Sequence, residues 1–235
     1  MLDRRLPIDP NARFVRLGGR PPRITMALLI AQLAVFLLFV FADAPTWLTE
    51  HLALSASKAL GLFEVWQPVT ALWIHLGLRS LVFDLVVLWL FGSALERWWG
   101  GRRFAVFWGV TGVVGLVVGM LVGMAKPTAL MAGSQGSAVA MLIASAIIFP
   151  AHLIHLRTII PIKATLVCLL MVGFVLLGGV ISRLWLDIAI QLGGGLAAVA
   201  FLGPRRLIQQ WRVKRMKKKL HVIGGGKNDS GPYLN

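Results

Sequence analysis

The sequence predicts an all-α membrane protein whose six transmembrane helices form one bundle, and three observations support this fold class. First, 57% of the 235 residues are hydrophobic and only 14% are charged, whereas a soluble domain usually has about 25% charged residues. Second, the apolar residues gather into segments of about the length that crosses a bilayer. Third, the basic residues gather outside those segments, on one side of the predicted membrane.

The six apolar segments account for most of the chain. They cover residues 24–42, 78–95, 104–125, 133–149, 164–182 and 184–203. The first two are separated by 43–77, a stretch that contains four large aromatic side chains, Trp47, Phe63, Trp66 and Trp73. Because aromatic rings favour the boundary between lipid and water, we expect this long first loop to lie in the membrane interface.

The net charge of +15 reflects topology rather than a nucleic-acid partner. If there are six spans, the two tails and the second and fourth loops share one side, which then holds 20 of the 24 Lys and Arg residues. Only Lys58, Arg79, Lys126 and Arg183 fall on the other side. The positive-inside rule therefore predicts a multi-pass protein, expected in a bacterial inner membrane, with both termini in the cytoplasm.

The predicted organisation has three parts: a basic cytoplasmic tail at 1–23, the membrane domain at 24–203 and a second basic tail at 204–235. We expect anionic lipid to associate with the basic tails. No metal or cofactor is predicted. The single cysteine, Cys168, excludes a disulfide or a cysteine-based zinc site, and His152 and His155 have no carboxylate or cysteine cluster nearby.

Small residues recur every four positions in two of the spans. Gly115, Gly119 and Gly123 form one such series, and Gly194 with Ala198 forms another. Small residues on one face allow transmembrane helices to approach closely. Packing within one bundle is the favoured interpretation; a dimer face formed by the first series is the alternative, and the oligomeric state stays open.

Several short motifs occur in an order that resembles the rhomboid family of intramembrane serine proteases. They are Trp66-Gln67-Pro68-Val69-Thr70 followed by His75, Gly92-Ser93-Ala94-Leu95-Glu96, Gly100-Gly101-Arg102-Arg103-Phe104, Gly133-Ser134-Gln135-Gly136 and Gln191-Leu192-Gly193-Gly194. The resemblance covers about residues 24–203. It implies a six-helix rhomboid-like bundle with a long interfacial first loop.

The resemblance also implies where the catalytic groups should lie, and this chain lacks them. The family's serine on span four corresponds to Gln135, and its histidine on span six corresponds to Gln191. An amide offers no hydroxyl nucleophile and accepts no proton near neutral pH. The family's oxyanion-side His and Asn correspond to Ser80 and Asp84, and a carboxylate there would repel the developing negative charge. The sequence thus resembles a rhomboid pseudoprotease without catalytic residues.

If the fold is retained, Gln135 and Gln191 should meet across spans four and six with Asp84 close by. We expect Asp84 to be protonated and bonded to Gln135, or ionised in a water-filled pocket. As in other rhomboid-like pseudoproteases, the expected role is to bind transmembrane segments of client proteins through these three residues, and so to affect the clients' folding, trafficking or turnover.

Two other functions stay open at this point. One is an active intramembrane serine protease with a displaced nucleophile, Ser134 or Ser137, and Asp84 or His75 as its base. The other is a small transporter that uses Asp84, since an ionisable group inside a span is costly and usually functional. The lack of a clear inverted repeat argues against transport.

Overall fold

A computed structural model of the chain describes residues 14–15, 19–41, 46–149, 153–154, 162–181 and 184–203. The predicted tail at 204–235, most of the tail at 1–23, and both His152 and His155 lie outside the described residues. Met1–Phe201 forms one compact unit, and the contacts reported below are internal to it.

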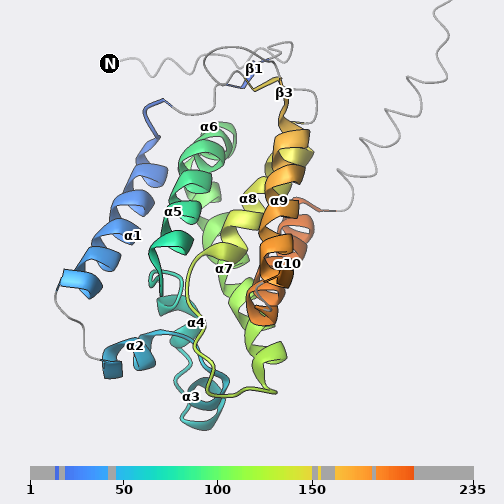
Figure 1. Cartoon of the computed structure of the whole chain (residues 1–235). Coiled ribbons are helices and arrows are strands. Elements are labelled where there is room, and N and C mark those ends of the chain that lie inside the picture. Colours follow the sequence, from blue (N-terminus) through green and yellow to red (C-terminus); the bar gives the residue numbers. More distant parts are fainter. Residues whose placement is uncertain are drawn as a thin grey trace, which may run out of the picture. The chain divides into compact units, whose positions relative to one another are not determined.

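Helices occupy all six predicted apolar segments (Figure 1). They are α1 (Arg23–Phe41), the continuous run of α5 (Leu78–Val87), η1 (Leu88–Gly92) and α6 (Ser93–Trp99), then α7 (Gly101–Gly123), α8 (Gln135–Ile148), α9 (Ala164–Ile181) and α10 (Trp185–Leu202). Four of these, the first three and α10, are long and apolar enough to cross a membrane, whereas α8 and α9 are shorter apolar helices. The helical fold class is thus confirmed, and the count of six crossings stays a prediction.

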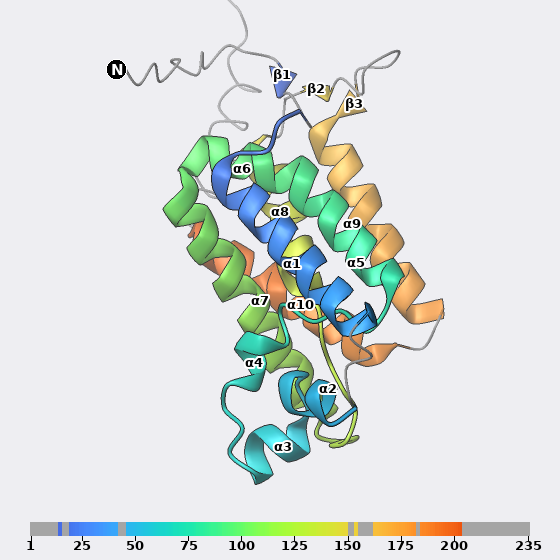
Figure 2. The same cartoon turned by 90° about the vertical axis from the view of Figure 1, so that its left-hand side faces the viewer.

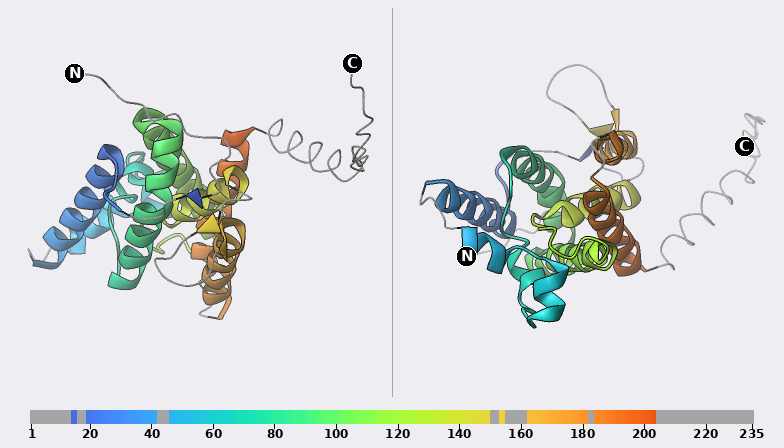
Figure 3. Two further views of the ribbon diagram at one scale, coloured as in Figure 1. Left: turned by 90° about the horizontal axis from the view of Figure 1, so that it is seen from above. Right: turned by 60° about the horizontal axis from the view of Figure 1, so that its bottom comes forward.

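The shortest of the apolar helices, α8, is also the most buried. It has 14 residues, most of them buried, and many are Ala, Ser or Gly, which let neighbouring helices approach. Figure 3 shows α8 in the interior, with the other apolar helices around it. Since protein rather than lipid surrounds it, α8 does not need the length of a lipid-exposed span.

Close backbone contact joins α7, α8 and α10 at three glycines. A Cβ at Gly115 would lie 2.7 Å from the Ile190 backbone oxygen and 3.2 Å from the Gly136 Cα. A Cβ at Gly194 would collide with the Gly136 backbone. The predicted small-residue faces therefore pack inside the bundle, as the favoured interpretation held.

The second apolar segment contains a π-helical turn, η1, between α5 and α6. Its last residue, Gly92, has no room for a side chain, because a Cβ would lie 3.0 Å from Phe104 Cζ and 3.3 Å from Met141 Sδ. Such π turns commonly occur inside helices near functional sites. Here the turn lies between Asp84 and Glu96 and changes the helical register from one residue to the other. These two residues anchor the segment on either side of the turn.

The long first loop folds into three short helices, α2 (Thr46–Leu52), α3 (Ala56–Gly61) and α4 (Gln67–Thr70). Gln67 holds them together: its Oε1 accepts from the Ser55 backbone nitrogen at 3.0 Å, and its Nε2 donates to Glu64 Oε2 at 2.6 Å. Figure 2 shows α2–α4 at the end of the bundle opposite the α6–α7 junction.

The prediction of purely helical structure missed one small sheet. Strands β1 (Phe14–Val15), β2 (Leu153–Ile154) and β3 (Ile162–Lys163) pair in that order, β1 parallel to β2 and β2 antiparallel to β3. Each strand has two residues, which is too short to produce an alternating pattern in the sequence.

Candidate functional site

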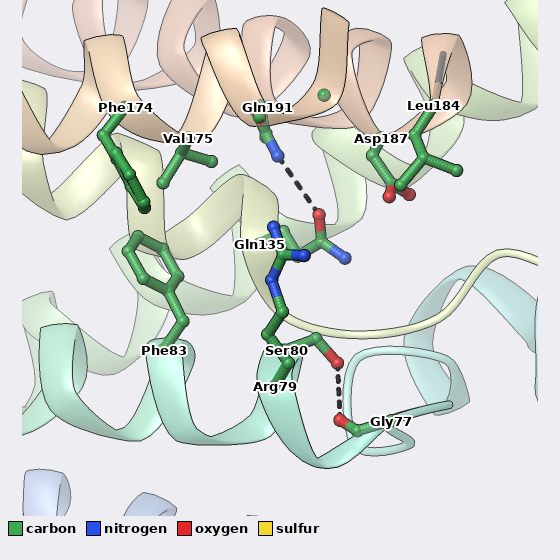
Figure 4. Close-up of a pocket in the computed structure, with 12 residues that line it drawn as sticks. Gly77, Arg79, Ser80, Phe83, Gln135, Phe174, Val175, Leu184, Asp187 and Gln191 are labelled. Carbon is green, nitrogen blue, oxygen red and sulfur yellow. Dashed lines mark hydrogen bonds between the residues drawn. The ribbon is translucent and has the colours of Figure 1, made fainter. Parts of the chain in front are cut away.

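The two glutamines predicted to meet are in contact. Gln135 is the first residue of α8, Gln191 lies in the middle of α10, and Gln191 Nε2 donates to Gln135 Oε1 at 3.2 Å (Figure 4). The close approach of Gly136 and Gly194 brings the two helices together beside this pair. Gln191 is 3% exposed, and its Oε1 has no hydrogen-bond partner among the described residues.

The glutamine pair lies at the wall of a cavity of about 390 Å³. The cavity separates α5 from α9 and reaches α8 and α10, as Figure 4 shows. Four apolar side chains and three glycines line it together with five polar or charged side chains. These lining residues are Gly77, Arg79, Ser80, Phe83, Gln135, Phe174, Val175, Gly178, Gly179, Leu184, Asp187 and Gln191. An apolar cavity with a few convergent polar groups is the usual form of a binding site.

Two charged residues of the cavity were not assigned to the site from the sequence. Arg79 and Asp187 both line it. The Arg79 guanidinium reaches α9, since a Cβ at Gly178 would lie 3.6 Å from Nη2. The sequence did carry a signal: both residues lie in the first turn of a predicted span, and those two turns fall on the same side of the membrane under the six-span topology.

Ser80 and Asp84, one helical turn apart on α5, lie in different surroundings. Ser80 lines the cavity, and its hydroxyl donates to the Gly77 backbone oxygen at 2.9 Å, across the first turn of the helix. Asp84 is 1% exposed and does not line the cavity. The side chains of Ser80 and Asp84 therefore do not line the same cavity.

Asp84 bonds to the segment that precedes Gln135 rather than to Gln135 itself. Its Oδ2 accepts from the Ser134 backbone nitrogen at 3.0 Å and from the Ser134 hydroxyl at 2.8 Å, and lies 3.1 Å from His75 Nε2. Its Oδ1 has no partner among the described residues. The expected bond from Asp84 to Gln135 is therefore wrong.

This buried network connects four parts of the chain. Gln32 on α1 donates from Nε2 to the Ser134 hydroxyl at 2.9 Å, which adds α1 to His75 of the first loop, Asp84 of α5 and Ser134 at the start of α8. Gln32, Asp84 and Ser134 are each at most 2% exposed. The network thus fixes the backbone immediately before Gln135, so Asp84 is a positioning residue for the glutamine pair.

Neither candidate for a displaced nucleophile lines the cavity. The Ser134 hydroxyl lies between Gln32 and Asp84, as described above. The Ser137 hydroxyl donates to the Trp108 backbone oxygen at 2.7 Å, and Ser137 is fully buried. Among the residues that the structure describes, no three His, Cys, Asp or Glu side chains gather as a metal site would require.

Fold and site together define a membrane-embedded helical protein with a cavity beside a partly buried polar pair. The rhomboid domain family matches residues 62–204, well over half of the chain, so the chain belongs to the rhomboid domain family. A region of 99 residues is 29% identical to "Rhomboid protease GluP" of Bacillus subtilis (strain 168). That region is 41% of this chain and 19% of the relative, so the match spans about a fifth of the relative's length.

Proposed function

We propose that this rhomboid-family membrane protein is a pseudoprotease that binds transmembrane segments of client proteins. The observation that carries the proposal is the 3.2 Å contact between Gln135 and Gln191 at the wall of the cavity. By the motif resemblance, these amides stand where a rhomboid protease has its serine and histidine. Neither amide supplies an attacking oxygen or takes up its proton.

The same amides are suited to binding. With Gln191 Nε2 bonded to Gln135 Oε1, the amide nitrogen of the half-buried Gln135 remains a donor, and Gln191 Oε1 is a buried acceptor that a client would reach only if the side chain moved. A peptide group that has lost its helical partner offers the complementary donor and acceptor. Leaving such a group unpaired in lipid costs roughly several kcal/mol. A client segment with a polar or helix-breaking residue would satisfy both sides. Asp84 contributes by holding the start of α8 in place.

The route to the cavity is the gap between α5 and α9. Phe83 of α5 and Phe174 of α9 lie opposite each other at one side of the cavity (Figure 4). Phe174 is 74% exposed, so little of its ring packs within the chain. Lateral entry past these rings would bring a client helix to the glutamines without first passing through water.

Photo-crosslinking tests the binding role. A photoreactive residue replaces Phe174, and adducts with clients are compared with and without Gln135→Trp, which fills the cavity. Adducts should fall at least fivefold in the filled variant. The control is Val122→Trp, an equal addition at an exposed position of α7 away from the cavity. Equal adducts in both tryptophan variants would contradict the proposal.

A fluorophosphonate probe tests the absence of a nucleophile separately. The purified protein should stay unlabelled, because the Ser134 and Ser137 hydroxyls are both buried in hydrogen bonds outside the cavity. Labelling that disappears in Ser134→Ala or Ser137→Ala would establish an activated serine. In that case the chain would be a protease, whatever its affinity for clients.

We also propose six crossings of a bacterial inner membrane with both termini in the cytoplasm. The starts of α1 and α7, which carry Arg23, Arg102 and Arg103, lie at one end of the bundle, opposite the first loop (Figure 1). Reporter fusions after residues 130 and 203 test this: the first should report the outer side and the second the cytoplasm. The reverse result at either point would overturn the topology.

A further inference from the structure

A second cavity lies at the α6–α7 junction, away from the glutamine pair. It has a volume of about 490 Å³, and its lining includes Trp99, Arg102, Arg103, Val106 and Phe201. Trp99 ends α6, the two arginines belong to the first turn of α7, and Phe201 comes from α10. None of the functions considered above uses this cavity.

The polar groups of this second cavity are all hydrogen-bond donors or cations. Arg102 and Arg103 are exposed and form no ion pair with a carboxylate within the described residues. The Arg103 guanidinium stacks on Trp99, with its carbon 5.5 Å from the ring centre. Trp99 Nε1 is buried and has no hydrogen-bond acceptor in the described part of the chain. Among the described residues, the lining of this cavity therefore carries two cations and no carboxylate.

The carboxylate of Glu96, on α6, does not pair with the two arginines of this cavity. Glu96 is 6% exposed, and its two oxygens accept from the Ile24 and Thr25 backbone nitrogens and the Thr25 hydroxyl at 2.7–3.0 Å. It is thus fully used at the start of α1. Arg102 and Arg103 lie in the first turn of a 23-residue helix, where guanidinium groups and helix N–H groups both favour a phosphate group.

An apolar strip begins directly beside the arginines. Val106, Val110 and Val114 follow Arg102 at intervals of four residues along α7, which places them along one helix face. They are 50%, 46% and 37% exposed. A ligand that fits both parts has an anionic head followed by a long hydrocarbon chain.

We propose that the α6–α7 junction is a specific binding site for an anionic phospholipid. The phosphate lies on Arg102 and Arg103 at the start of α7. One acyl chain runs along Val106, Val110 and Val114. This site is distinct from general attraction of lipid to the basic tails, because it is built from described residues of two membrane helices.

Native mass spectrometry with defined lipids tests this site. The full chain, purified in detergent, is titrated with dioleoylphosphatidylglycerol or dioleoylphosphatidylcholine. The phosphatidylglycerol adduct should be retained preferentially and should fall at least tenfold in Arg102→Gln/Arg103→Gln. Lys126→Gln, which removes a cation beyond the other end of α7, should leave the adduct unchanged. An equal adduct in the double variant and in the unmodified chain would overturn the proposal.

A second arm separates a lipid from free phosphate. Val106→Trp keeps both arginines but blocks the start of the apolar strip, so the phosphatidylglycerol adduct should fall at least fivefold. Millimolar inorganic phosphate should not displace the lipid from the unmodified protein. If phosphate displaces it, or if Val106→Trp retains the full adduct, the site recognises a phosphate group alone and the lipid assignment is wrong.

Discussion

Ser134 donates two hydrogen bonds to a single oxygen of Asp84, one from its backbone nitrogen at 3.0 Å and one from its hydroxyl at 2.8 Å. Both residues are at most 2% exposed. This relationship gives a buried acid inside a membrane bundle a structural reason, because the carboxylate anchors the entry of α8 on α5. The next residue, Gln135, then points into the cavity toward Gln191.

Removing the Asp84 carboxylate should therefore destabilise the bundle. Asp84→Ala leaves the Ser134 nitrogen and hydroxyl and His75 Nε2 without their acceptor, and we expect a loss of about 2–4 kcal/mol in free energy of unfolding. Unfolding in mixed detergent micelles measures this loss of free energy. Asp187→Ala removes a half-buried acid that has no such partners among the described residues, and it should cost less than about 1 kcal/mol. Equal losses would show that the network does not carry the stability.

The glycine contact between α7 and α10 should tolerate no side chain. In Gly115→Ala the new methyl group would lie 2.7 Å from the Ile190 backbone oxygen, so the helices must separate, at a cost of about 1–3 kcal/mol. The matched control is Gly109→Ala on the same helix, where nothing lies within 4 Å. That variant should be neutral or slightly more stable, by up to about 1 kcal/mol. The same unfolding assay measures the stability of both variants. An unchanged free energy of unfolding in Gly115→Ala would refute the close contact.

Restoring the family's catalytic pair should restore reactivity toward a fluorophosphonate. The two side chains meet across α8 and α10, so Gln135→Ser combined with Gln191→His places a hydroxyl and an imidazole on facing positions of these helices. We expect labelling at least tenfold above the unmodified protein. Each single substitution should stay at background, since a serine without a base, or a base without a serine, is insufficient. Labelling of the histidine single variant would instead point to another serine.

The start of α1 should depend on Glu96. In Glu96→Ala the backbone nitrogens of Ile24 and Thr25 lose an acceptor at 3.0 and 2.7 Å, and their amide hydrogens should exchange at least tenfold faster. The accompanying loss of stability should be about 2–3 kcal/mol. Glu50→Gln removes an exposed ion pair with Lys58 and should change stability by less than about 1 kcal/mol. Unchanged exchange in Glu96→Ala would show that α1 is anchored otherwise.

The sequence predicted the helices well, because apolar length and composition are local properties. The segments at 24–42 and 104–125, for example, appear as Arg23–Phe41 and Gly101–Gly123. The order of short motifs also predicted that Gln135 and Gln191 would meet, but α9, which carries none of those motifs, lines the cavity as well. The sequence did not predict the partners of Asp84, since these lie on two other segments, the first loop and the start of α8. The nearest in sequence is nine residues away and the farthest fifty.

The chain by itself therefore determined the class of fold and the apolar helices, and its motif resemblance predicts amides at the two positions where rhomboid proteases have reactive groups. Those follow from composition and from residue identity at fixed spacings. Only the tertiary structure decided that Asp84 turns away from the cavity, that Arg79 and Asp187 line it, and that Arg102 and Arg103 flank a second one. Each of these depends on which helix faces lie together, and glycines that allow three backbones to touch set that arrangement.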